Sequence, residues 1–176
     1  MTSDDSVRAA YDVVAASGTG LDVLVNNAGI GGRFAAPVDT VPEDFLPVFG
    51  VNLLGPVRMT HTFLPLLRES TEPRVVMVSS GMGSFGVTMD PDRVESTMHG
   101  LAYPSSKAAL TMVTTMYAKS LPELSVVAVD PGYTATDLND RSGRQTVTEG
   151  TDAVVEACTA ESAPALFFDR FGPVGW

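Results

Sequence analysis

Hydrophobic residues follow two patterns along this chain, and the two patterns alternate. Apolar positions three and four residues apart predict helices, which we place at residues 4–16, 40–67, 103–120 and 148–158. Short continuous apolar runs predict buried strands, at Leu21–Val25, Arg74–Val78, Ser125–Val129 and Ala165–Phe168. Strands without polar alternation are typical of parallel sheets that are covered on both faces. The sequence therefore predicts an α/β fold with a four-stranded parallel sheet in chain order and helices packed on it.

Between these elements the sequence gives more local signals. Thr40 and Glu43 have the spacing of a capping box and Pro42 suits a first helical turn, so the second helix should begin there. Pro56 lies inside that helix, and we expect a kink or break at this point because proline has no N–H to donate. Residues 81–100 show no clear period and predict a long loop.

Composition and charge restrict the class of protein. The 176 residues suffice for a sizeable core, and we interpret residues 1–176 as one domain. A net charge of −10 argues against nucleic acid or an anionic membrane as a partner. No apolar run approaches the ~20 residues that span a bilayer, and the start of the chain lacks the features of a signal peptide. Cys158 is the single cysteine and leaves no internal disulfide. We expect a cytoplasmic protein without a metal site.

Tyr103 and Lys107 lie four residues apart at the start of the third predicted helix, so their side chains share one helix face. A nearby ammonium stabilises the phenolate, and we expect Lys107 to lower the pKa of Tyr103 from about 10 toward neutral pH. A tyrosine tuned in this way can exchange a proton with a carbonyl or alcohol oxygen. Taken alone, the pair also fits an exposed tyrosine and a solvated lysine on a surface helix.

Small polar residues follow three of the predicted strands, where parallel sheets commonly build their sites. The three segments are Asn26-Asn27-Ala28-Gly29, Ser79-Ser80-Gly81 and Asp130-Pro131-Gly132-Tyr133-Thr134. Asn52 lies in the middle of the second predicted helix, where a buried amide needs hydrogen-bond partners. Each of these features alone is also compatible with a plain turn or a structural asparagine.

Together these motifs resemble the classical short-chain dehydrogenases/reductases, from about residue 5 to the C-terminus. The resemblance rests, in order, on Asn26-Asn27-Ala28-Gly29, Asn52, Ser79-Ser80, Tyr103-x-x-x-Lys107 and Pro131-Gly132-Tyr133-Thr134. The ending, residues 167–176, also resembles bacterial carbonyl-reductase-like members. The resemblance implies a Rossmann-like, doubly wound parallel sheet in three layers (α/β/α). It further implies an oxidoreductase that uses NAD or NADP.

The resemblance also implies catalytic roles for particular residues. Tyr103 would be the general acid in carbonyl reduction and the base in alcohol oxidation. Lys107 would lower the tyrosine pKa and hold the nicotinamide ribose. Ser80 would hydrogen-bond the substrate oxygen, whereas Ser79 should point the opposite way because side chains alternate along a strand. Asn52 would anchor a water that joins Lys107 to solvent.

The cofactor and the substrate would be bound by further segments. The residues implied to line the cofactor are Asn26, Ala28, Gly29, Tyr103, Lys107, Pro131, Gly132 and Thr134. The chain between the serine and the tyrosine is longer than in compact members of the family. We expect this insert, Met89 to Gly100, to shape the pocket for a small carbonyl or alcohol substrate.

One departure from the family pattern changes what the chain can bind. The family opens with a strand and a glycine-rich turn, T-G-x-x-x-G-x-G, which binds pyrophosphate at a helix N-terminus, and this sequence has no such motif. We expect roughly 60 residues, equal to two crossover units, to be missing upstream, with Met1 an internal start. The residue that distinguishes NAD from NADP lies in that part.

Two functions follow from this sequence. The first is hydride transfer between a nicotinamide cofactor and a small carbonyl or alcohol. The second is a cofactor-free protein without activity, which acts only by associating with another chain. Without a preceding strand, the edge of Leu21–Val25 is unpaired, so we expect a homo-oligomer, marginal stability and weak cofactor binding by this chain.

Overall fold

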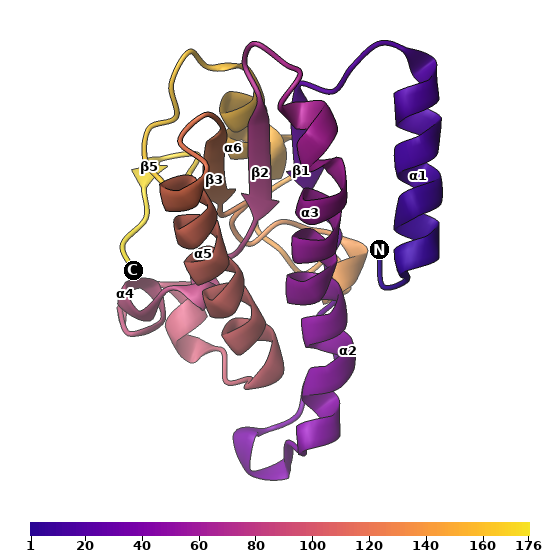
Figure 1. Ribbon diagram of the computed structural model, residues 1–176. Coiled ribbons are helices and arrows are strands. Elements are labelled where there is room, and N and C mark those ends of the chain that lie inside the picture. Colours follow the sequence, from indigo (N-terminus) through magenta and orange to yellow (C-terminus); the bar gives the residue numbers. More distant parts are fainter.

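The computed structural model describes all residues, 1–176, and is built around a five-stranded sheet (Figure 1). The strands lie in chain order: β1 (Val23–Asn26), β2 (Arg74–Val78), β3 (Ser125–Val129), β4 (Phe167–Asp169) and β5 (Gly172–Pro173). The first four pair in parallel and β5 pairs antiparallel to β4. In the central register, Val76 lies between Val25 and Val127. The predicted parallel order is therefore confirmed.

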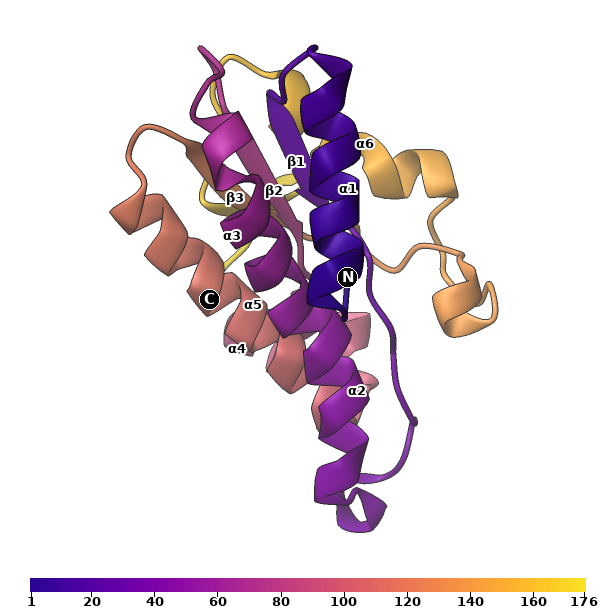
Figure 2. The same cartoon turned by 45° about the vertical axis from the view of Figure 1, so that its right-hand side comes forward.

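Helices cover both faces of this sheet, which gives the three-layer α/β/α arrangement. On one face lie α1 (Asp4–Ser17), α3 (Gly55–Leu67) and α5 (Ala102–Ser120), and on the other lies α6 (Val147–Thr159) (Figures 1 and 2). The first face is packed by a cluster that includes Phe63, Met77 and Leu110. The second is packed by a smaller cluster that includes Val127 and Ala157. The Rossmann-like doubly wound fold is confirmed by this layering.

The strand boundaries differ from prediction mainly at the sheet edges. β2 and β3 match their predicted ranges, because every position from Val75 and Val126 onward is buried in a continuous apolar run. β1 begins two residues later than predicted, and β4 likewise. β5 was not predicted, because two residues that include Pro173 have no strand pattern.

The second predicted helix is several pieces in series. Two single turns, Pro37–Asp39 and Pro42–Asp44, precede α2 (Phe45–Phe49), a wide π-helical turn (Gly50–Leu54) and α3. The predicted cap is wrong by one residue: the carboxylate of Asp44, rather than that of Glu43, accepts the N–H of Val41 at 3.0 Å. The Thr40 hydroxyl instead donates to the Ala36 carbonyl.

The irregularity expected at Pro56 takes the form of this wide turn. The N–H of Gly55 bonds to the carbonyl of Gly50, five residues back, and Pro56 then occupies the first turn of α3. A proline in a first turn requires no N–H partner, so α3 continues without interruption from it. The break therefore precedes Pro56 and places Asn52 inside the π-helical turn.

Residues 81–100 contain short turns rather than a bare loop. They are a turn at Gly81–Gly83, α4 (Phe85–Thr88) and a turn at Val94–Thr97. The C-terminal residues lie against α4, since the N–H of Gly86 donates to the Trp176 carbonyl at 2.7 Å. No helix of this structure is long and apolar enough to cross a membrane.

Candidate active site

A cavity of about 670 Å³ opens at the carboxyl ends of β1, β2 and β3, beside α5 and α6. Eight of the predicted site residues line it: Ala28, Gly29, Ser80, Tyr103, Lys107, Pro131, Gly132 and Thr134. Two predicted site residues, Asn26 and Asn52, do not. From the predicted insert, Glu95 and Met98 form part of the wall, as expected for that segment. Segments that lie far apart in the chain, such as those of Ala28 and Thr134, thus converge on one space.

Lys107 is 4% exposed and lies at the floor of this cavity. Its Nζ donates to the Val78 carbonyl at 2.7 Å and lies 5.6 Å from the centroid of the Tyr103 ring. Burial lowers the pKa of Lys107 to about 8, because a low-dielectric surrounding disfavours the ammonium, while the Asp130 carboxylate acts in the opposite direction. This ammonium is therefore easier to deprotonate than an exposed one.

The pKa of Tyr103 moves opposite to our expectation. Burial is the main cause that raises it to about 12; the neighbouring Ser80 hydroxyl acts to lower it, and the charge of Asp130 makes a smaller contribution that raises it. The expected lowering by Lys107 is not seen, because desolvation of the phenol outweighs it and the lysine Nζ is directed at Val78. In this structure Tyr103 carries its proton throughout the neutral range.

Ser79 and Ser80 point in different directions, as the strand alternation predicts. The Ser79 hydroxyl is 1% exposed and bonds into α5, at 3.2 Å from the Lys107 carbonyl and 2.7 Å from the Thr111 hydroxyl. The Ser80 hydroxyl faces Tyr103 and accepts the N–H of Met82 at 3.2 Å. Ser79 therefore ties β2 to the helix, whereas Ser80 lies beside the phenol.

Asn52 is fully buried and does not line the cavity. It acts as a brace, by which we mean that its side chain holds neighbouring segments together through hydrogen bonds. Its Oδ1 accepts the N–H of Ile30 and its Nδ2 donates to the Ile30 carbonyl, both at 2.9 Å. The same Nδ2 lies 3.0 Å from the Ser106 hydroxyl on α5. A Cβ on Gly29 would lie 3.5 Å from both Asn52 Oδ1 and Lys107 Nζ, so Asn52 is adjacent to the lysine as predicted.

The expected position of Asn26 beside the cofactor is corrected by the structure, because its side chain does not reach the cavity. Its Nδ2 donates to the Thr60 hydroxyl and to the Met77 sulfur, on the α3 side of the sheet. Leu24 and Asn26 alternate with Val25, so the strand directs both of them into that buried face. Asn27, which was not assigned, lines the cavity instead. The alternation along β1 was the signal that could have found it.

The turn after β3 has the backbone expected of a ligand-facing loop. Gly132 has φ +69°, and a Cβ there would lie 1.9 Å from the Gln145 side chain, so no other residue fits without rearrangement. The Thr134 hydroxyl donates to the Pro131 carbonyl at 2.9 Å. A Cβ on Gly150 would lie 2.2 Å from that hydroxyl, so α6 approaches the turn closely.

Several wall residues were missed by sequence reasoning. Asp130 follows β3 directly and is 2% exposed, and its position at a strand end was the available signal. Residues 135–146 lie outside every predicted helix and strand, but they contain a turn at Asp137–Asn139, and Gln145 forms a bridge with Thr134. That segment and the start of α6 close one side of the cavity, and no periodic pattern indicates this.

Comparison with known proteins decides the family. The family model described as short chain dehydrogenase matches residues 1–146. The chain belongs to the short-chain dehydrogenase/reductase family. It is 36% identical over 173 residues to a short-chain dehydrogenase of Penicillium roqueforti, covering 95% of this chain and 68% of that protein. It is also 32% identical over 203 residues to (+)-neomenthol dehydrogenase of Arabidopsis thaliana, covering 85% and 69%.

Further matches show how broadly this dehydrogenase/reductase resembles its relatives. It is 40% identical over 120 residues to a protein named C-signal from Myxococcus xanthus, covering 67% of this chain and 68% of that one. Its structure matches that of NADPH-bound carbonyl reductase from chicken fatty liver with a TM-score of 0.88 and 26% identity, covering 99% and 74%. The carbonyl-reductase likeness is confirmed, whereas fungal and plant relatives leave the predicted restriction to bacteria unsupported.

Proposed function

We propose that this protein transfers a hydride between a nicotinamide cofactor, NAD or NADP, and a small carbonyl or alcohol. The observation that carries the proposal is the convergence of Ser80, Tyr103 and Lys107 on one cavity. When bound, the nicotinamide supplies the hydride chemistry, and the protein supplies orientation and a proton. Family membership and the carbonyl-reductase likeness support the reaction class.

Each catalytic side chain has a distinct role in this proposal. The protonated Tyr103 phenol is the form needed to donate a proton to a carbonyl oxygen, which suits the reductive direction at neutral pH. The Ser80 hydroxyl, facing the same phenol, would bind the substrate oxygen. Lys107 would bind the nicotinamide ribose, and Asn52 would anchor a water beside it.

The residues on the cofactor side fit the nicotinamide half of the dinucleotide. Gly29 leaves open space beside Lys107 Nζ, since a Cβ there would lie only 3.5 Å away. Ala28, Pro131, Gly132 and Thr134 complete this side of the cavity. The sequence has no glycine-rich turn for the pyrophosphate, so we expect this chain by itself to bind a whole dinucleotide weakly. We further propose that the 176 residues form one domain and that the protein is a homo-oligomer.

A second candidate function is association without catalysis. It is favoured by the unpaired edge of β1, which has a hydrogen-bonded neighbour on the β2 side only. The similarity to a relative named C-signal, rather than dehydrogenase, is compatible with it. The two candidates differ in one observable: only the first requires a reduced nicotinamide to be consumed.

The Tyr103→Phe variant tests the proposed reaction. Turnover of a small ketone is followed by loss of absorbance of NADPH, NADH or reduced nicotinamide mononucleotide, which lacks the adenylate half. Removing the transferable proton should lower the rate by roughly 10²–10⁴-fold. Tyr117→Phe, a change on the same helix but in the core cluster, is the matched control and should keep the rate. Equal rates in wild type and Tyr103→Phe would contradict the assignment.

A further inference from the structure

Asp130 is a buried carboxyl group that the proposed reaction does not use. Its Oδ1 accepts the N–H of Gly132 at 2.9 Å, within the turn that follows β3. Its Oδ2 is buried and has no hydrogen-bond partner. The N–H of Gly81 lies close enough to lower the pKa of this carboxyl but does not have the geometry of a hydrogen bond. An unpaired buried acceptor is costly to the folded state, so this oxygen needs a donor.

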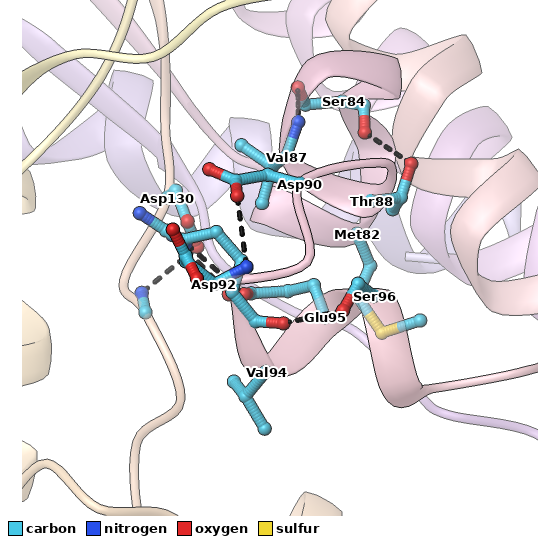
Figure 3. Close-up of polar contacts among 12 residues, drawn as sticks. Met82, Ser84, Val87, Thr88, Asp90, Asp92, Val94, Glu95, Ser96 and Asp130 are labelled. Carbon is cyan, nitrogen blue, oxygen red and sulfur yellow. Dashed lines mark hydrogen bonds and ion pairs between the residues drawn. The ribbon is translucent and has the colours of Figure 1, made fainter.

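A second buried carboxyl, that of Glu95, lies on the same side of Asp130. A Cβ built on Gly81 would lie 2.8 Å from Asp130 Oδ2 and 3.2 Å from Glu95 Oε1, so the two groups flank the same point. Figure 3 shows the Asp130 side chain directed at the segment that carries Glu95. Glu95 is 7% exposed and is paired with Arg93, whose Nε lies 3.3 Å from Oε2.

If both carboxyls are ionised, two buried negative charges line the same pocket. Two neighbouring carboxylates in a buried site cannot both ionise without strong repulsion, and a shared proton converts one of them into a donor. Arg93 is paired with Glu95, and its charge also acts on Asp130 and Asp169. The charged or titratable groups that face Asp130 include Arg93 and Glu95 from the 81–100 segment, Tyr103 and Lys107 from α5, and Asp169 from β4. The pocket that both carboxyls line also contains Asp92, Tyr133, Arg144 and Arg170.

We propose that Asp130 and Glu95 share one proton, and that the resulting hydrogen bond holds two turns together. One is the turn at Gly81–Gly83, which directly follows Ser80 and is called the Ser80 turn below; the other is the Pro131–Gly132 turn after β3. Through Oδ1 the aspartate holds the turn after β3, and through Oδ2 it holds the segment that follows Ser80. Asp130 is thus a positioning residue for Ser80. Only that last statement rests on the proposed function, because the carboxyl pair itself is a property of the fold.

The expected pH dependence of the carboxyl pair follows from the direction in which the pKa of Asp130 is shifted. Burial raises the pKa of Asp130, with smaller contributions from the charges of Glu95 and Asp169. A carboxyl with a raised folded-state pKa adds stability that is complete below its unfolded pKa of about 3.9. That contribution is lost as the pH rises through the folded-state pKa. We therefore expect the Ser80 turn to loosen with increasing pH.

Carbon-13 NMR of the aspartate and glutamate carboxyls tests the shared proton without any turnover. In wild type, one carboxyl should keep its proton at pH values where the exposed ones are ionised, and that signal should be absent in Asp130→Asn. Asp92→Asn removes an exposed carboxyl in the same segment and should retain the signal. An Asp130 that titrates in the ordinary range would overturn the proposal, whatever the activity of the protein.

The positioning role is tested by the backbone amide shifts of residues 80–83 as a function of pH. In wild type they should follow the same transition as the carboxyl. In Asp130→Asn the side-chain amide donates to Glu95 at every pH, so this pH dependence should disappear while the fold is retained. If that variant does not fold, Glu95→Gln offers the same neutral donor from the other side. A pH dependence that persists in a folded variant, or a wild type without one, would refute the coupling.

Discussion

At the scale of single residues, burial rather than charge pairing sets the protonation of the two central side chains. It lowers the pKa of Lys107 to about 8 and raises that of Tyr103 to about 12. Both shifts favour the neutral form, as expected where desolvation dominates. At neutral pH Tyr103 is therefore a neutral phenol, whereas Lys107 is still mostly an ammonium because its pKa lies above 7.

The lysine shift predicts a particular pH dependence of stability. Between pH 8 and 10.5 the unfolded chain holds the Lys107 proton more tightly than the folded chain, so stability rises with pH across that window. The free energy of unfolding of wild type, relative to Lys107→Met, should therefore increase by roughly 3 kcal/mol over it. Urea titrations at several pH values measure this.

Sequence reasoning could predict which residues meet at the cavity but not their ionisation. Tyr103, Lys107 and Ser80 were located because residue type and spacing are visible in the sequence. The direction of the tyrosine pKa was wrong, because the degree of desolvation depends on which segments cover the site. Asn26 was misplaced for a simpler reason: its position in β1, not its motif, decides which face of the sheet it occupies.

At the scale of elements, the π-helical turn at Gly50–Leu54 determines where the side chain of Asn52 points. It directs Asn52 toward the segment after β1, where both polar groups of the Ile30 backbone are satisfied by one side chain. The hydrophobic period of the sequence carries through this turn, so its position is not encoded in the pattern. The buried strands, by contrast, were predictable because their valine runs permit no other placement.

Asn52→Ala should be destabilising because it leaves the partly buried N–H and C=O groups of Ile30 without partners. Each orphaned N–H or C=O costs about 1–3 kcal/mol, and Ile30 contributes one of each. Chemical denaturation should show a loss of several kcal/mol. Asn27→Ala, at an exposed position one residue beyond β1, is the matched control and should change stability by about 0.5 kcal/mol or less. Similar losses in both variants would show that Asn52 is not a brace.

At the scale of the whole molecule, the sheet has an open side. β1 pairs with β2 alone, and Val25 on it is 36% exposed, so one row of backbone groups faces solvent. Such an edge is a template for pairing with another chain. The structure bears out the expected edge position of this strand, while self-association stays a prediction.

Val25→Lys should reduce self-association, because a charged side chain on an edge strand opposes pairing with a second strand. Size-exclusion chromatography over a range of concentrations should show wild type shifting to larger species and the variant remaining smaller. Val38→Lys, at a position 92% exposed outside the sheet, is the control and should behave as wild type. A wild-type chain that stays monomeric at all concentrations would contradict this prediction.

The two hydrogen bonds between the Asn52 side chain and the Ile30 backbone also have a thermodynamic consequence for ligand binding. Fixing the backbone of one residue costs about 1–2 kcal/mol of conformational entropy, and a loop that orders on binding subtracts that amount from its affinity. Residues 27–29 lie between β1 and an Ile30 whose N–H and C=O are already held. Their ordering cost is met during folding, so a ligand that contacts them should bind with little entropic penalty from this segment.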